Sequence, residues 1–167
     1  MLAAGYTAPA FSLPDLNGTK HTLAEMLPLA PVLVVLYKIS CPVCQLILPY
    51  LQRISNSRLQ IVAISQDDAA ATSGFASAFG IRTLTLLDTQ KTGYAVSNAF
   101  GITNVPSLFL IETDGSISYA GSGFHKAELE AFPRAPDARS SGRMKMSPPG
   151  RLVEGPRIRL PGGESFA

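Results

Sequence analysis

A run of strand-forming apolar residues, 32–37, leads into the sequence CPVC at 41–44 and then into a helix-period segment, 45–54. A continuous apolar run of this length is typical of a central strand buried on both faces of a sheet. Pro42 suits the first position of a helix, because the N–H that proline lacks would have no intrahelical partner there. The sequence therefore predicts a buried strand that ends at two cysteines at the start of a helix.

The predicted helix start gives the two cysteines different chemistry. Cys41 lies at the helix N-terminus, where unpaired amides and the helix dipole favour the thiolate over the thiol. Cys44, one turn further in, is expected to be shielded and less acidic. Lys38, three residues before Cys41, is a candidate to lower the pKa of the Cys41 thiol electrostatically, or else it points into solvent. We expect Cys41 to attack a disulfide, and Cys44 to resolve the mixed disulfide that this attack forms.

Two other interpretations of the cysteine pair remain open from the residues alone. The pair could be half of a zinc site, but a four-coordinate site needs two further ligands. The two histidines, His21 and His125, are far apart and do not follow zinc-finger spacing, so we expect no metal. The pair could also be an inert buried couple. Redox chemistry is favoured because the motif follows a strand and opens a helix.

Length and composition predict one globular domain with a sizeable core, because the chain has 167 residues, 46% hydrophobic and 16% charged. Two cysteines are too few for a disulfide scaffold. No apolar run reaches the length of a membrane span. Residues 1–5 lack a basic start and an apolar stretch, so they do not resemble a secretory signal. We expect a cytoplasmic protein as written, or a periplasmic one if a leader was removed.

The character of the chain changes after residue 132. Residues 1–132 carry seven Lys/Arg and nine Asp/Glu, whereas residues 133–167 carry seven and three, with six prolines and five glycines. We therefore predict a redox domain over 1–132 and a disordered tail over 133–167. The basic residues of the tail are scattered and lack aromatic interleaving, so we expect no nucleic-acid partner.

Strand and helix patterns alternate along residues 1–132, which predicts a mixed α/β sheet covered on both faces. An N-terminal hairpin is expected around the Asn17-Gly18 turn, because Asn-Gly favours positive φ. Later strands are expected at 59–65, 84–87, 107–111 and 116–120, and helices at 69–79, 92–100 and 126–132.

Three features together make the chain resemble the thioredoxin superfamily, in particular the TlpA-like thiol–disulfide oxidoreductases and redoxins that border the peroxiredoxins. The first is strand–CPVC–helix with Pro49 five residues after Cys44, and the second is the segment 100–107, which ends in Val105-Pro106-Ser107. The third is the opening 8–18, which is similar to the N-terminal hairpin of this branch. The strand–helix unit at 84–100 also fits the branch as an insertion.

The resemblance implies a redox-active Cys41–Cys44 disulfide with no further cofactor. It also implies a cis Pro106 that stands across from the cysteines, with Val105 and Pro106 facing the backbone of a protein substrate. Expected partners are protein thiols and disulfides and an unknown redox partner, and we expect a monomer. The chain departs from the family where an acidic residue assists the second cysteine, because those positions hold Val35 and Ile47.

Three functions compete on these residues. The leading one is a thiol–disulfide oxidoreductase that acts on proteins through CPVC. The alternative is a peroxiredoxin-like thiol peroxidase, with Cys41 peroxidatic and Cys44 resolving. The peroxiredoxin pattern PxxxTxxC is not met, because Val34 and Lys38 stand at its Pro and Thr positions. The third is a binding module on the same fold that uses its tail.

Overall fold

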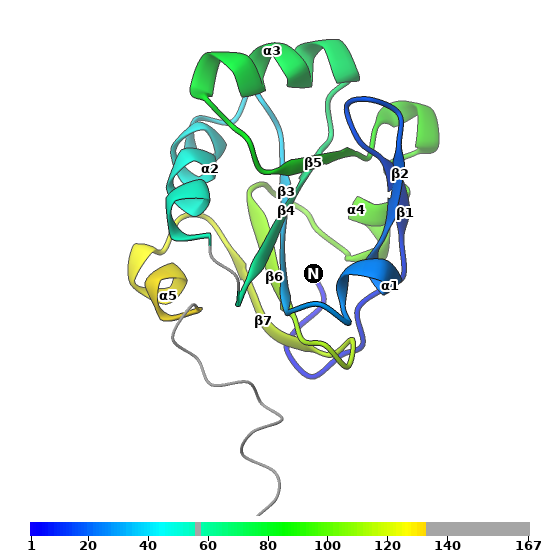
Figure 1. Cartoon of the computed structure of the whole chain (residues 1–167), viewed down its shortest axis with the longest axis vertical. Coiled ribbons are helices and arrows are strands. Elements are labelled where there is room, and N and C mark those ends of the chain that lie inside the picture. Colours follow the sequence, from blue (N-terminus) through cyan, green and yellow to red (C-terminus); the bar gives the residue numbers. More distant parts are fainter. Residues whose placement is uncertain (56–57, 133–167) are drawn as a thin grey trace, which may run out of the picture. The chain divides into compact units, whose positions relative to one another are not determined.

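A five-stranded mixed sheet forms the centre of the fold (Figure 1) in the computed structural model, which describes residues 1–55 and 58–132. The strand order is β5-β4-β3-β6-β7; β3, β4 and β5 are parallel, and β6 is antiparallel to β3 and to β7. The strands are β3 (Val32–Tyr37), β4 (Gln60–Ser65), β5 (Leu84–Leu87), β6 (Ser107–Ile111) and β7 (Ile117–Ser122). The predicted mixed α/β sheet is confirmed.

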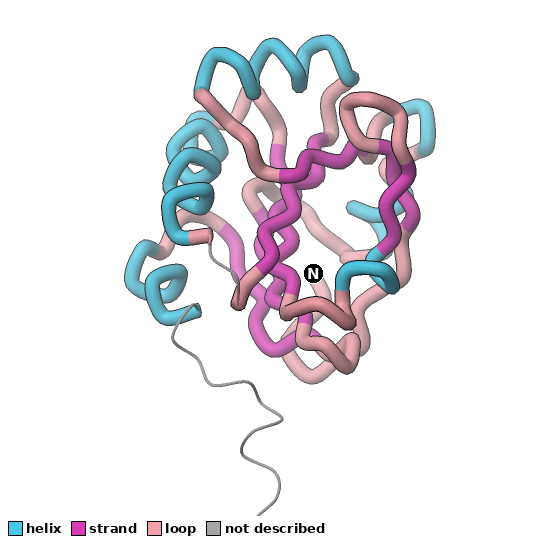
Figure 2. The backbone as a smooth tube through the Cα atoms, in the orientation of Figure 1, coloured by secondary structure: helices cyan, strands magenta, loops and turns pink. Residues whose placement is uncertain are grey.

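Helices and a hairpin cover the two faces of this sheet (Figures 1 and 2). One face packs against α2 (Pro42–Ile54), α3 (Ala69–Phe79) and α5 (Lys126–Ala131). The other face packs against the hairpin of β1 (Ser12–Pro14) and β2 (Lys20–Thr22), together with α1 (Leu23–Met26) and α4 (Ala95–Ala99).

The central strand β3 explains why both faces must be covered. All six of its residues are at most 1% exposed. Side chains alternate across a strand, so Val32, Val34 and Leu36 belong to the core on the hairpin side. Leu33, Val35 and Tyr37 belong to the core under α2. The uninterrupted apolar run is therefore the signature of a strand with no solvent face.

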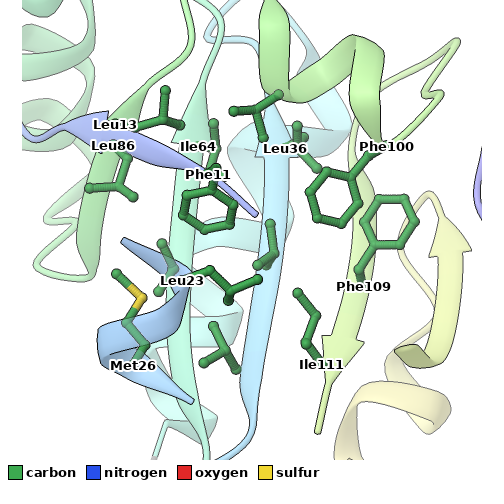
Figure 3. Packing of buried hydrophobic residues seen from close by; sticks show 14 of the residues in the cluster. Phe11, Leu13, Leu23, Met26, Leu36, Ile64, Leu86, Phe100, Phe109 and Ile111 are labelled. Carbon is green, nitrogen blue, oxygen red and sulfur yellow. The ribbon is translucent and has the colours of Figure 1, made fainter. Parts of the chain in front are cut away.

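The N-terminal hairpin contributes directly to one core (Figure 3). Phe11 and Leu13 pack with residues of the sheet, and the rings of Phe100 and Phe109 lie 4.7 Å apart in the same cluster. Full burial of each such side chain stabilises the fold by about 1.5–3 kcal/mol. At the turn, the Asp15 carboxylate accepts the N–H of Asn17 and of Thr19 at 2.8 and 3.0 Å.

One predicted helix, 92–100, is wrong in its first half. The chain forms a 3-10 turn over Gln90–Thr92, and α4 begins only at Ala95. Gly93 and Tyr94 between them have φ of 68° and 52°, in the left-handed region, which an α-helix cannot accommodate. The buried carboxylate of Asp88 then accepts the first free amides of α4.

Among the described residues, no helix is both long enough and apolar enough to cross a membrane. Residues 133–167 lie outside the described ranges, so the predicted domain boundary at 132 and the predicted tail stay predictions. The same holds for the expected monomer.

Candidate active site

The loop between β3 and α2 places the two cysteines at the start of the helix. Cys41 is the N-cap of α2, with Pro42 at the first helical position. The Cys41 N–H donates to the Lys38 carbonyl and the Cys41 carbonyl accepts the Gln45 N–H, both at 3.1 Å. The Cys41 sulfur accepts the N–H of Cys44 at 3.4 Å. This sulfur therefore faces an unpaired end of the helix, where negative charge is stabilised.

Burial differs sharply between the two thiols, which are both free. Cys41 is half-buried, whereas Cys44 is 0% exposed and lies within the apolar cluster under α2. Burial raises the pKa of the Cys44 thiol to about 12, a hydrogen bond with the Lys38 backbone works against this, and the neighbouring Cys41 and Asp67 add to it. Cys44 is therefore protonated at neutral pH unless a neighbouring group removes its proton.

The segment just before β6 brings Val105 and Pro106 to the cysteines. The Cys41 thiol donates a hydrogen bond to the Val105 carbonyl at 3.5 Å, across 64 positions of sequence. Pro106 is buried, and the Val105–Pro106 peptide bond is cis. The structure thus brings together the two segments that the resemblance connects.

Lys38 contributes its backbone to this arrangement. Its carbonyl accepts from Cys41 and its backbone hydrogen-bonds to the Cys44 thiol, while the residue as a whole is exposed. An effect of the Lys38 ammonium on the Cys41 thiol stays a prediction.

Asp67, an acidic residue that no sequence motif indicated, lies at the edge of the sheet where the cysteine loop begins. Asp67 follows β4, and its carboxylate accepts the Ile39 N–H at 2.8 Å. The signal for it is the parallel pairing of two neighbouring strands, because the segments that follow parallel strands emerge at the same edge. The Asp67-Asp68 pair after the strand at 59–65 would have drawn attention to this position once β3 and β4 were known to be neighbours.

Apolar side chains also lie on the segments that carry the two cysteines and Val105. Val43 and Leu46 on the first turns of α2 are 38% and 65% exposed. Ile39 and Val105 are partly buried and pack against the same core cluster as Cys44. Val43 and Leu46 therefore expose apolar surface on the helix whose N-cap is Cys41.

The two histidines of the chain hydrogen-bond to groups other than the cysteines. His21 hydrogen-bonds to Asp15 at 3.0 Å, and His125 to the Ser122 carbonyl at 3.1 Å. Across 1–55 and 58–132, no three His, Cys, Asp or Glu side chains are grouped as a metal site would need.

Comparison with known proteins places these features in context. The Redoxin family model matches residues 3–138. The thiol-disulfide oxidoreductase ResA of Geobacillus thermodenitrificans is 28% identical over 121 residues, covering 70% of this chain and 67% of that protein. Among solved structures, the thioredoxin domain of a thiol-disulfide oxidoreductase from Bacteroides vulgatus has a TM-score of 0.72 and 22% identity, with 80% of this chain and 97% of that chain covered. A putative thiol:disulfide interchange protein DsbE from Chlorobium tepidum has a TM-score of 0.70 and 22% identity, with coverages of 80% and 95%.

Proposed function

Because this chain belongs to the Redoxin family, whose model it matches over most of its length, we propose that it exchanges dithiols and disulfides with protein substrates through Cys41 and Cys44. The observation that carries the proposal is the asymmetry of the pair. A half-buried sulfur at a helix N-terminus touches the Val105 carbonyl, and a fully buried thiol lies one turn behind it.

The family match also confirms the resemblance to the thioredoxin superfamily and its TlpA-like branch. The curated relatives are named as thiol-disulfide oxidoreductases, and these names agree with the predicted class of enzyme. The solved structures support the fold.

In the proposed reaction, the Cys41 thiolate attacks one sulfur of a substrate disulfide. A mixed disulfide forms, and the other substrate sulfur leaves as a thiolate. Cys44 then loses its proton and attacks the Cys41 sulfur, so that the Cys41–Cys44 bond forms and the second substrate thiolate leaves. The substrate gains two electrons and the protein loses two. A partner dithiol must return them, and the same steps run in reverse would oxidise a substrate.

We assign substrate contact to Val105 and Pro106, because the Val105 carbonyl already accepts a hydrogen bond from the attacking sulfur. A substrate chain that lies beside this segment would bring its disulfide within reach of Cys41. The exposed Val43 and Leu46 would contact the apolar side chains of that substrate. Exchange between sulfurs requires no bound cofactor, and the redox group in this proposal is the Cys41–Cys44 pair itself.

The peroxidase alternative has no observation in its favour. The Val34 and Lys38 positions offer no hydroxyl to a peroxide, since Val34 is buried inside β3 and Lys38 is exposed.

Trapping of the mixed disulfide tests the proposed function. The Cys44→Ser variant, incubated with a disulfide-containing peptide, should accumulate a covalent adduct on Cys41 that mass spectrometry detects and dithiothreitol removes. The matched Cys41→Ser variant should form almost none, because its remaining thiol is buried. Equal adducts in both variants, or none in either, would contradict the proposal.

A further inference from the structure

The turn 38–41 carries the chain from the end of β3 to the start of α2, and so it sets the position of the Cys41 sulfur. The Cys41 N–H donates to the Lys38 carbonyl at 3.1 Å, which closes the turn. Ile39 lies inside the turn and is half-buried. Its N–H and its carbonyl take no part in the closing bond, so they depend on other partners.

Two side chains from different elements hold the backbone of Ile39. The Ile39 N–H donates to Asp67 Oδ2 at 2.8 Å, and the Ile39 carbonyl accepts from Gln45 Nε2 at 3.0 Å. Asp67 follows β4, whereas Gln45 belongs to α2. These two bonds form the Ile39 clamp, which ties the turn both to the neighbouring strand and to the helix that the turn begins.

Gln45 binds the turn through its backbone as well as through its side chain. Its N–H donates to the Cys41 carbonyl at 3.1 Å, and its side-chain amide reaches two residues further back, to Ile39. Without that amide, the Ile39 carbonyl would lose its partner and could regain one only by turning toward water. The turn would have to move for this to happen.

The other end of the clamp is attached to the buried end of β4. The Asp67 N–H donates to the Ser65 hydroxyl at 3.1 Å, and the Asp67 carbonyl accepts from the Thr72 hydroxyl at 3.3 Å. Ser65 and Thr72 are both 0% exposed and bond to each other at 2.8 Å. The Asp67 carboxylate is therefore a fixed point against which the Ile39 backbone is held.

The Cys41 sulfur makes two contacts that depend on the position of the turn. It accepts the Cys44 N–H at 3.4 Å, at the N-terminus of α2, and it donates to the Val105 carbonyl at 3.5 Å. The stabilisation of negative charge by a helix end falls off within the first turn of the helix. A turn that moved away from α2 would therefore take the sulfur out of the place where its thiolate is favoured.

We propose that Gln45 is a positioning residue for the attack by Cys41, because the Ile39 clamp keeps the Cys41 sulfur at the N-terminus of α2. The proposal deepens the proposed function and rests on it. Gln45 acts through Ile39 and takes no part in the exchange of sulfurs. Its contribution is a larger share of thiolate at Cys41, and so a faster attack, at a pH where most of the thiol is protonated.

The variant that tests this role is Gln45→Met, which keeps the length of the side chain and removes the amide donor. It changes no charge near the cysteines. α2 carries no charged side chain before its last turn, and the segment 100–111 carries none at all. Lys38 and Asp67 beside the turn, and His125 beyond β7, are the same in the variant as in the wild type. A change in thiol reactivity must therefore come from geometry.

The matched control is Gln52→Met on the same helix. The Gln52 side chain also bonds to backbone groups, since it donates to the Gly80 carbonyl at 2.9 Å and accepts the Arg82 N–H. This control loses two side-chain bonds, whereas Gln45→Met loses one. The control should therefore lower the melting temperature at least as much as Gln45→Met does, while its bonds lie away from the turn 38–41.

The rate of alkylation of Cys41 by iodoacetamide, measured on the reduced full chain at pH 6 and pH 10 with the adduct mapped by mass spectrometry, separates geometry from stability. At pH 6, Gln45→Met should react about three- to tenfold more slowly than the wild type, in keeping with the usual effect of a helix end on a charge. At pH 10, where the thiolate predominates in both proteins, the two rates should agree within about twofold. Gln52→Met should match the wild type at both pH values.

A pair of variants at the other end of the clamp gives a second test, which does not depend on the folding of Gln45→Met. Asp67→Asn and Asp67→Ala remove the same charge, but only asparagine keeps a side-chain oxygen for the Ile39 N–H. At pH 6, Asp67→Ala should therefore be alkylated about three- to tenfold more slowly than Asp67→Asn.

Three results would overturn the role of Gln45 while the proposed function stands. They are equal rates for Gln45→Met and the wild type at pH 6, an equal loss of rate in Gln52→Met, and a loss in Gln45→Met that is as large at pH 10 as at pH 6. Equal rates for the two Asp67 variants would overturn the clamp. A wild type that does not react at Cys41 at all would instead overturn the proposed function, and the role of Gln45 with it.

Discussion

At the scale of single residues, the environments of two thiols that lie three positions apart decide the chemistry. The Cys44 pKa of about 12 follows from burial first and from neighbouring negative charge second. The neutral thiol is therefore the form that fits the core. In the proposed reaction, an anion forms there only while Cys44 attacks the mixed disulfide. Cys41 has partial access to solvent and is placed at a helix end.

This difference predicts selective alkylation of the reduced protein. At pH 8, a thiol with a pKa of about 12 is ionised in about one molecule in ten thousand. Limiting iodoacetamide should therefore label Cys41 almost exclusively, as mapped by mass spectrometry. Labelling of Cys44 should begin only as the pH rises toward 12. Labelling in denaturant, where both thiols should react equally, is the control, and comparable labelling in the folded state would contradict the assignment.

Sequence reasoning reached the cysteines and the Val105-Pro106 segment but not Asp67. The cysteines are recognised from their local spacing, and the proline segment from a family resemblance. The position of Asp67 beside the cysteine loop can be inferred only when β4 is known to lie beside β3 in parallel. Strand neighbours depend on contacts between distant segments, which a one-dimensional pattern does not contain.

At the scale of elements, strands and helices that are fixed by burial were predicted well. The strand at 32–37 has no solvent face, so its apolar run could not be taken for a loop. The helix 92–100 failed because its first residues depend on backbone conformation, and Tyr94 with φ of 52° is a position where propensity misleads. Asp88, seven residues before α4, provides the acceptors that start the helix.

Two aspartates at helix N-termini allow a direct comparison of capping in the core and at the surface. The buried Asp88 carboxylate accepts from the N–H groups of Val96 and Ser97 and from the Ser97 hydroxyl. Asp88→Ala would leave these donors without partners and should lower the free energy of unfolding by about 3 kcal/mol.

The exposed Asp68 caps α3 through a single bond to the Ala71 N–H, and Asp68→Ala should cost about 1 kcal/mol. Urea denaturation of both variants and of the wild type measures these losses. An equal loss in the two variants would show that burial of the Asp88 carboxylate adds nothing.

At the scale of the whole molecule, the family match ends at residue 138. Removing residues 139–167 should leave a folded domain with unchanged thiol reactivity, because that segment has no apolar periodicity to bury. We expect a change in melting temperature below about 3 °C. A drop of more than about 8 °C, which corresponds to roughly 2 kcal/mol or more, would show that these residues stabilise the domain.

Phe132 provides the contrast for that experiment. Its ring packs edge-on against Tyr119, with the centroids 4.9 Å apart. The Phe132→Ala variant of the full chain should lower the melting temperature more than the truncation does, because it removes apolar contact from the described domain.

The N-terminal segment also touches the two outer strands of the sheet. Asp15 forms a β-bridge with Leu86 on β5, and Thr7 forms one with Ser116, the residue before β7. Outer strands with open backbone groups invite pairing with other molecules, which leads to aggregation. One stretch of chain therefore partly caps both margins of the sheet. If the protein exchanges disulfides with polypeptides, as proposed, such caps discourage those polypeptides from adding themselves to the sheet as further strands.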